Sequence, residues 1–241
     1  MSLLSSFLLL AASALQFPSD YEDAGLTDLQ NRQLGYDFGR CVVDSRAKRA
    51  ARVIVENLSN SEIIRNHSIL FDGDCLVEAW PHNGQGGMQM KLPGDLMRYS
   101  LADALVEREF AAGLPSEIST RPPLAHDTVN LAEFEPKPGK KLKKAQLEEL
   151  ATRKASAVRF NYLARFGECI VRTNPSGSHR LIMQKPGSRD ERAAFVALQP
   201  AFNNCLDTGQ TFSANFTVLR GTVALNAYRL ARATPSAGAS R

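Results

Sequence analysis

Three short blocks of this sequence occur twice in the same order, and this internal duplication constrains the fold more than any other feature. The matching pairs are residues 38–43 with 166–171, residues 75–76 with 205–206, and residues 96–102 with 218–224. The first pair reads Phe-Gly-Arg-Cys-Val-Val and Phe-Gly-Glu-Cys-Ile-Val. Ordered self-similarity of this kind is typical of tandem structural units. The chain is therefore predicted to contain two similar units.

Each copy is predicted to be helical. The form Ser-x-x-Glu occurs at Ser59 and again at Ser188, and it is typical of a capping box at a helix N-terminus. In the second copy apolar residues recur at helical spacing, including Leu147, Val158 and Phe166. Hydrophobic residues make up 44% of the chain, which is enough to form a core. The predicted fold is mainly α, with two tandem disulfide-stapled helical repeats joined by a Pro-rich linker.

The domain boundaries follow from the duplication and from changes in composition. Four prolines and little periodicity indicate a linker between the copies, and a small, polar C-terminal segment indicates a disordered tail. The predicted parts are a signal peptide at 1–14, an acidic leader at 15–27, repeat 1 at 28–118, the linker at 119–140, repeat 2 at 141–232 and the tail at 233–241.

The N-terminal segment indicates export. Residues 2–15 carry no charge, and their leucine-rich run is followed by Ala-Ser-Ala, the form of a signal-peptide cleavage site. The expected basic residue before the run is missing, so a buried or interfacial helix and a single membrane anchor are the alternatives; the run is short for a span. We expect a periplasmic or secreted protein with no transmembrane segment after cleavage.

The four cysteines fit an oxidising compartment. Four cysteines allow three pairings, and the duplication favours pairing within each copy, Cys41 with Cys75 and Cys169 with Cys205. The alternatives are a metal site or a redox pair, but no C-x-x-C spacing is present. Structural disulfides are therefore predicted.

The candidate ligand contacts are Arg98, Arg220, Trp80 and His82. The two arginines occupy matching positions, where they could bind an anionic group or form structural bonds to a helix C-terminus or a carboxylate. Trp80 and His82 lie in a Gly-rich insertion of the first copy, which is either a binding loop or a longer surface turn. No motif for catalysis, a metal or a cofactor is found, so none of these is assigned.

Two basic clusters bear on the choice of partner. One spans Arg40 to Arg52, and the other lies at the end of the linker, from Lys137 to Lys144. They are solvated faces or patches for an anionic component of the cell envelope. Because an exported protein rarely meets nucleic acid, a protein or an anionic envelope component is the expected partner.

The paired Phe-Gly-x-Cys-Val/Ile-Val blocks, each followed by Cys-Leu and then Leu/Met-Arg, resemble a group of uncharacterised exported proteins from alphaproteobacteria. The resemblance covers Tyr36 to Arg232. It implies a periplasmic or secreted location and carries no known activity or catalytic residue.

Three functions are compatible with these observations. The first is a non-enzymatic, exported interaction or envelope protein. The second is a lipid or small-amphiphile binder in which the two units enclose an apolar cavity. The third is an enzyme with its site around Trp80, His82 and Arg98.

Overall fold

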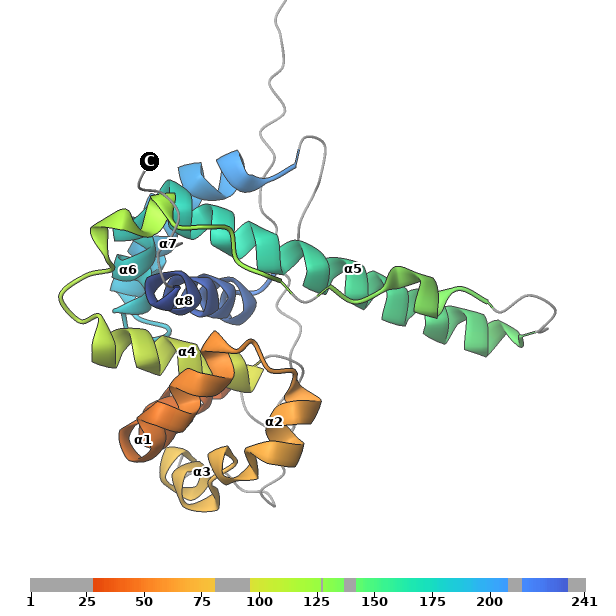
Figure 1. The fold of residues 1–241 in the computed structure, drawn as a ribbon, viewed down its shortest axis with the longest axis horizontal. Helices are drawn as coiled ribbons and strands as arrows, with labels where there is room; N and C mark the ends of the chain where they lie inside the picture. Colours follow the sequence, from red (N-terminus) through yellow and green to blue (C-terminus); the bar gives the residue numbers. More distant parts are fainter. Residues whose placement is uncertain (1–27, 81–95, 127, 137–141, 208–213, 234–241) are drawn as a thin grey trace, which may run out of the picture.

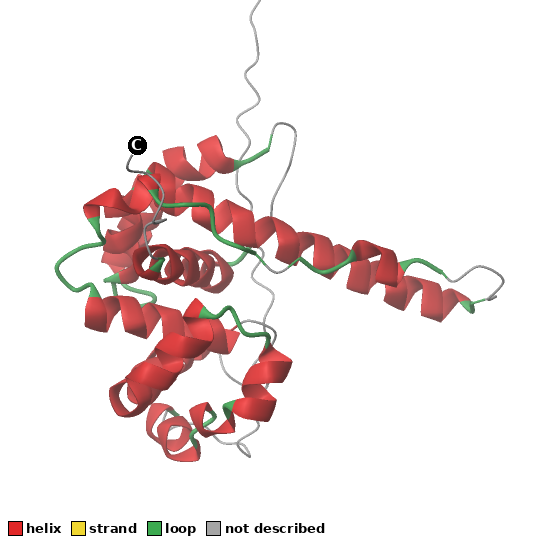
Figure 2. Cartoon of the chain, in the orientation of Figure 1, coloured by secondary structure: helices red, strands yellow, loops and turns green. Residues whose placement is uncertain are grey.

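The computed structural model describes residues 28–80, 96–126, 128–136, 142–207 and 214–233, and every regular element in these ranges is helical (Figures 1 and 2). The elements are α1 (Asp28–Val55), α2 (Asn60–Asn66), η1 (Ser68–Leu70), α3 (Gly73–Ala79), α4 (Leu96–Glu109), η2 (Ser116–Thr120), η3 (Leu131–Phe134), α5 (Lys144–Thr173), α6 (Pro175–Ile182), α7 (Arg189–Cys205) and α8 (Phe216–Arg232). The predicted mainly helical class is confirmed. The predicted signal peptide, the acidic leader, His82 and nearly all of the predicted tail lie outside the described residues.

Helices α4 and α8 pack against each other at the centre of the molecule, with α1 to α3 on one side and α5 to α7 on the other (Figure 1). Helix α8 is buried from Leu219 to Ala231, with Leu225 as the exception. One continuous apolar core joins residues of both halves, among them Val42 and Leu105 from the first and Ile170 and Val223 from the second. The two halves, residues 28–118 and 141–232, therefore share a core. None of the helices in the described ranges has the length and apolarity that crossing a membrane requires.

Two disulfides fasten short helices to long ones. Cys41 in α1 is bonded to Cys75 in α3, and Cys169 in α5 is bonded to Cys205 in α7. These are the pairs that the duplication favours. Each bond closes a loop within one half, so the halves are held together by packing and polar contacts alone.

Two glycines allow close helix packing. A Cβ atom at Gly39 would lie 2.3 Å from the backbone oxygen of Ser100, and one at Gly167 would lie 2.4 Å from Cγ2 of Thr222. Both distances are shorter than any real contact, so only glycine lets α1 approach α4 and α5 approach α8 this closely. Both glycines directly follow a phenylalanine in the first duplicated block.

The N-terminal half of α5 extends away from the body (Figure 1). Leu147 and Val158, which the helical spacing assigns to the apolar face, are 45% and 47% exposed. The helix that their spacing predicts is confirmed, and both side chains are exposed because this part of α5 extends beyond the core. The segment between the halves runs back along α5, and the side chain of Asn161 bonds both backbone groups of Val129.

Candidate functional site beside Arg98

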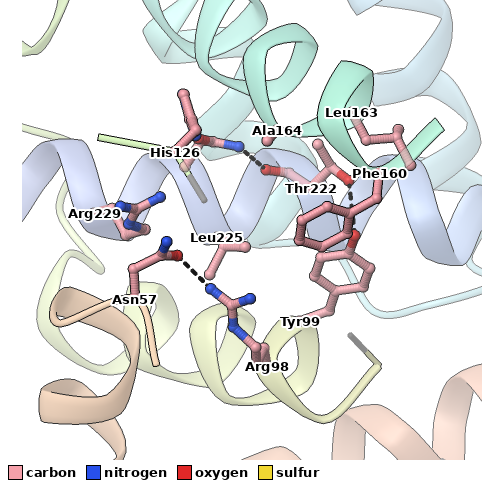
Figure 3. Close-up of a pocket in the computed structure, with 11 residues that line it drawn as sticks. Asn57, Arg98, Tyr99, His126, Phe160, Leu163, Ala164, Thr222, Leu225 and Arg229 are labelled. Atoms are coloured by element: carbon pink, nitrogen blue, oxygen red, sulfur yellow. Dashed lines mark hydrogen bonds between the residues drawn. The ribbon is translucent and has the colours of Figure 1, made fainter. Parts of the chain in front are cut away.

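A small pocket, partly open to solvent, lies where α4, α5 and α8 meet (Figure 3), and its free space is about 20 Å³. The lining residues are Asn57, Arg98, Tyr99, His126, Phe160, Leu163, Ala164, Thr222, Leu225, Asn226 and Arg229.

One side of the pocket is cationic. Arg98 of α4 and Arg229 of α8 are only 3% and 7% exposed. Arg98 donates a hydrogen bond to Oδ1 of Asn57, and Arg229 donates one of 2.6 Å to the backbone oxygen of Ala125. Among the described lining residues there is no Asp or Glu. Two guanidinium groups thus line one side of the pocket.

His126 is held at the edge of this cationic side by Glu168. Its Nε2 atom lies 2.5 Å from Oε2 of Glu168, and Oε1 of the same carboxylate accepts a 2.7 Å bond from Arg172. Burial alone would raise the pKa of Glu168, but the bonds from His126, Arg172 and the Leu124 amide outweigh it and lower the pKa. Glu168 is thus an ionised anchor that orients the imidazole ring.

The opposite side of the pocket is apolar and aromatic. Phe160, Leu163 and Tyr99 face the cationic residues across the pocket, with Leu225 between them (Figure 3). The hydroxyl of Thr222 donates a 3.4 Å bond to the Tyr99 oxygen. A charged wall opposite an apolar one is suited to a molecule with a charged end and an apolar body.

Arg220, the residue that matches Arg98, has a different environment. Its guanidinium forms a bidentate pair with Asp103, with Nη2 2.8 Å from Oδ2, and its Nη1 lies 3.3 Å from Oε1 of Glu191. It also donates to three backbone oxygens at the end of α6, those of Leu181, Ile182 and Gln184. Arg220 is therefore a buried structural tie between α8, α4, α6 and α7.

The contact between Arg220 and Glu191 alters the capping box expected at Ser188. The Ser188 side chain does accept from the Glu191 amide, as expected. The Glu191 carboxylate, however, accepts from the Gly187 amide, Arg32 and Arg220 and does not turn back to Ser188. At Ser59 the reciprocal box with Glu62 is complete. The two Ser-x-x-Glu patterns look alike in sequence, but Glu191 pairs with the buried Arg220, whereas Glu62 completes its capping box.

A second carboxyl group near Arg220 titrates near neutrality. Burial, with help from the charge of Asp103, raises the pKa of Glu107 from 4.5 to about 7. The Tyr36 hydroxyl donates a 3.1 Å bond to Glu107, which opposes the rise. This side of the α4–α8 pair is thus rich in carboxylates, unlike the pocket beside Arg98.

The structure separates the sequence-predicted site residues. Arg98 lines the pocket, and Arg220 lies in its own ionic network. Trp80 caps the C-terminal end of α3 and is not among the residues lining the Arg98 pocket. Sequence reasoning missed Arg229 and Asn226. The available signal was the presence of two polar residues within the long apolar pattern of α8.

No protein-family model, curated protein or solved structure matches the chain. Within the described ranges, no group of three or more His, Cys, Asp or Glu side chains is arranged to hold a metal ion. The site is therefore interpreted from its own chemistry.

Proposed function

We propose that this protein is an exported, non-enzymatic binding protein whose pocket beside Arg98 takes a small organic anion with an apolar body. The observation that carries the proposal is the presence of two buried guanidinium groups, Arg98 and Arg229, in the lining of one pocket. Guanidinium groups recognise carboxylates and phosphates through charge-assisted hydrogen bonds.

The apolar wall supports an amphiphilic ligand over an inorganic ion. Phe160, Leu163 and Leu225 offer carbon surface that a bare phosphate would leave uncovered. The free space of the pocket is only about 20 Å³, so the proposed ligand places its charged end beside the arginines and its apolar body toward the open side. The proposal therefore joins the non-enzymatic hypothesis to a narrow form of the amphiphile-binder hypothesis.

Export and duplication form part of the same proposal. Two structural disulfides are the usual product of an oxidising compartment, which supports a periplasmic or secreted location. The matched contacts of Gly39 with Ser100 and of Gly167 with Thr222 support an origin of the two halves from one ancestral unit. The pocket then arose where the second half diverged from the first.

Calorimetric titration of the oxidised protein with hexanoate and with hexan-1-ol tests the proposal. We expect hexanoate to bind and hexanol to bind at least about tenfold more weakly, because only the former pairs with the arginines. Arg98→Gln should lose the preference. Arg52→Gln, with the same charge change at a side chain that is 64% exposed, should keep it.

A second variant tests the same pocket in case Arg98→Gln does not fold. Ala164→Leu fills the pocket without removing a polar group, so it should weaken hexanoate binding while the circular dichroism spectrum stays unchanged. Equal binding of hexanoate and hexanol, or binding that survives both pocket variants, would contradict the proposal.

A further inference from the structure

We propose that two copies of this chain form a weak dimer through the protruding half of α5, residues 144–160, with the two helices antiparallel. This half of the helix, called the α5 arm below, projects from the body (Figure 1). At a rise of 1.5 Å per residue it is roughly 25 Å long. The evidence comes from the residues that the arm exposes, and it is independent of the pocket beside Arg98.

One face of the arm is packed against its own chain. The segment at 128–136 runs along this face, where the Arg153 guanidinium lies 5.5 Å from the ring centroid of Phe134 and Asn161 bonds the backbone of Val129. Ala157, which lies midway between Arg153 and Asn161 at helical spacing, is only 6% exposed. This side of α5 is therefore accounted for within the chain.

A different face of the arm is apolar and exposed. Leu147, Ala151, Ala155 and Val158 recur every three or four residues, so they form one stripe along the helix. Leu147 and Val158 are 45% and 47% exposed, and both alanines are exposed as well. Small residues in the middle of a stripe let a second helix approach closely, and larger ones at its ends pack beside that helix. The stripe thus has the form of half of a helix–helix contact.

The order of residues along the stripe is self-complementary. In an antiparallel pair with a twofold axis near residue 153, residues equally far on either side of that position lie opposite each other. Ala151 then lies opposite Ala155 of the second copy, and Leu147 comes within one residue of Val158 of the second copy. A small residue meets a small one at the centre, and a large residue meets a large one at each end.

The charges beside the stripe select the antiparallel arrangement. Glu148 and Arg159 are both exposed and lie three helical turns apart on the same edge of the stripe. An antiparallel pair brings Glu148 within one residue of Arg159 of the second copy, and symmetry makes this contact twice. A parallel pair would place each charge beside its own kind. Glu148 also lies 3.8 Å from Lys144 of its own helix, a highly exposed contact of the kind that contributes little.

The geometry of the arm fits a second copy and indicates a modest affinity. Because the arm projects from the body, antiparallel pairing places the two bodies at opposite ends of the helix pair (Figure 1). One face of a short helix buries less area than a standard protein interface, so we expect a dissociation constant of about 100 µM.

Sedimentation equilibrium of the oxidised protein at low salt, from about 1 µM to about 500 µM, tests the proposal. We expect the average mass to rise from that of a monomer toward that of a dimer, and no further. Val158→Asp places a charge within the stripe and should weaken the dimer at least about tenfold. Val196→Asp makes the same change at a side chain of α7 that is 69% exposed, and it should leave the dimer unchanged.

A charge exchange tests the antiparallel arrangement. Glu148→Arg and Arg159→Glu should each weaken the dimer about fivefold, because each replaces two attractive contacts by two repulsive ones. The double variant should restore the wild-type affinity. Three turns of helix separate the two positions within one copy, so the rescue arises only between copies.

The possible outcomes all bear on the proposal. A monomer at every concentration would overturn it, and so would a dimer that Val158→Asp leaves unchanged, because the copies would then meet elsewhere. Single charge variants that weaken the dimer without rescue in the double variant would refute the antiparallel pairing. All four positions are exposed, so an unchanged circular dichroism spectrum is expected for each variant and shows that the fold is kept.

Discussion

Arg98 and Arg220 occupy matching positions in the sequence, and the surroundings of the two side chains differ completely. Arg220 meets Asp103, Glu191 and three backbone oxygens, and it ties four helices together. Arg98 donates a hydrogen bond to Asn57 and lines a pocket that is partly open to solvent. The comparison teaches that matching positions in the duplicated blocks can place a buried arginine in an ionic network in one half and in the lining of a pocket in the other.

A single position on the facing helix accounts for much of this difference. Asp103 lies five residues after Arg98 and meets Arg220, whereas Leu225 lies five residues after Arg220 and lines the Arg98 pocket. Each arginine thus lies near a residue of the other central helix. For Arg220 that residue is Asp103, which has a carboxylate, and for Arg98 it is Leu225, which is apolar.

The largest effect is expected from Arg220→Gln. It leaves Asp103 buried without its cation, which costs about 3 to 5 kcal/mol of the free energy of unfolding. The described lining around Arg98 contains no Asp or Glu that would lose a partner, so Arg98→Gln should lower the free energy of unfolding by about 1 kcal/mol. Urea unfolding of both variants checks the contrast, and equal losses would show that the two arginines have the same role.

The next largest effect concerns the disulfides. Replacing either pair by serines reopens a loop of 34 or 36 residues, which costs roughly 3 to 4 kcal/mol on the chain-entropy estimate. The two losses should affect the helices differently, because α3 packs mainly on α1 whereas α7 packs on both α5 and α6. Limited proteolysis should cut near α3 after loss of Cys41–Cys75 and spare α7 after loss of Cys169–Cys205. Cleavage in the reverse order would refute this.

A smaller effect should appear in the pH dependence of stability. Because the pKa of Glu107 is raised from 4.5 to about 7 in the folded state, the folded protein binds the extra proton between these values. Stability therefore falls as the pH rises through this window, by about 1 to 2 kcal/mol for a partly buried carboxyl group. Glu107→Gln should flatten this part of the profile measured by urea unfolding, and an unchanged slope would assign the dependence elsewhere.

The smallest effect on stability, within about 1 kcal/mol, is expected for the half-buried Leu225→Asp. This change places a carboxylate among the residues that line the pocket with Arg98. Hexanoate binding should be lost because the internal carboxylate competes for the guanidinium. Leu225→Asn, similar in shape and uncharged, is the matched control and should bind hexanoate. Undiminished binding to Leu225→Asp would place the anion away from Arg98.

The sequence carried enough information to predict the helical class, the disulfide pairs and the importance of two arginines. These features depend on local periodicity and on comparison of one half with the other. The pocket was not predictable, because Arg229 and Asn226 acquire their roles only when α8 packs against α4 and α5. The exposure of Leu147 was missed for a related reason: helical spacing shows which face is apolar but not whether anything packs on it.

The burial of α8 has a practical consequence for measuring affinity. Amide hydrogens of a helix buried at nearly every position exchange with solvent only through global unfolding. A ligand that binds only the native state suppresses that unfolding in proportion to its concentration over its dissociation constant. Hydrogen–deuterium exchange of residues 219–231 would therefore report ligand affinity directly, with no label on the protein or the ligand.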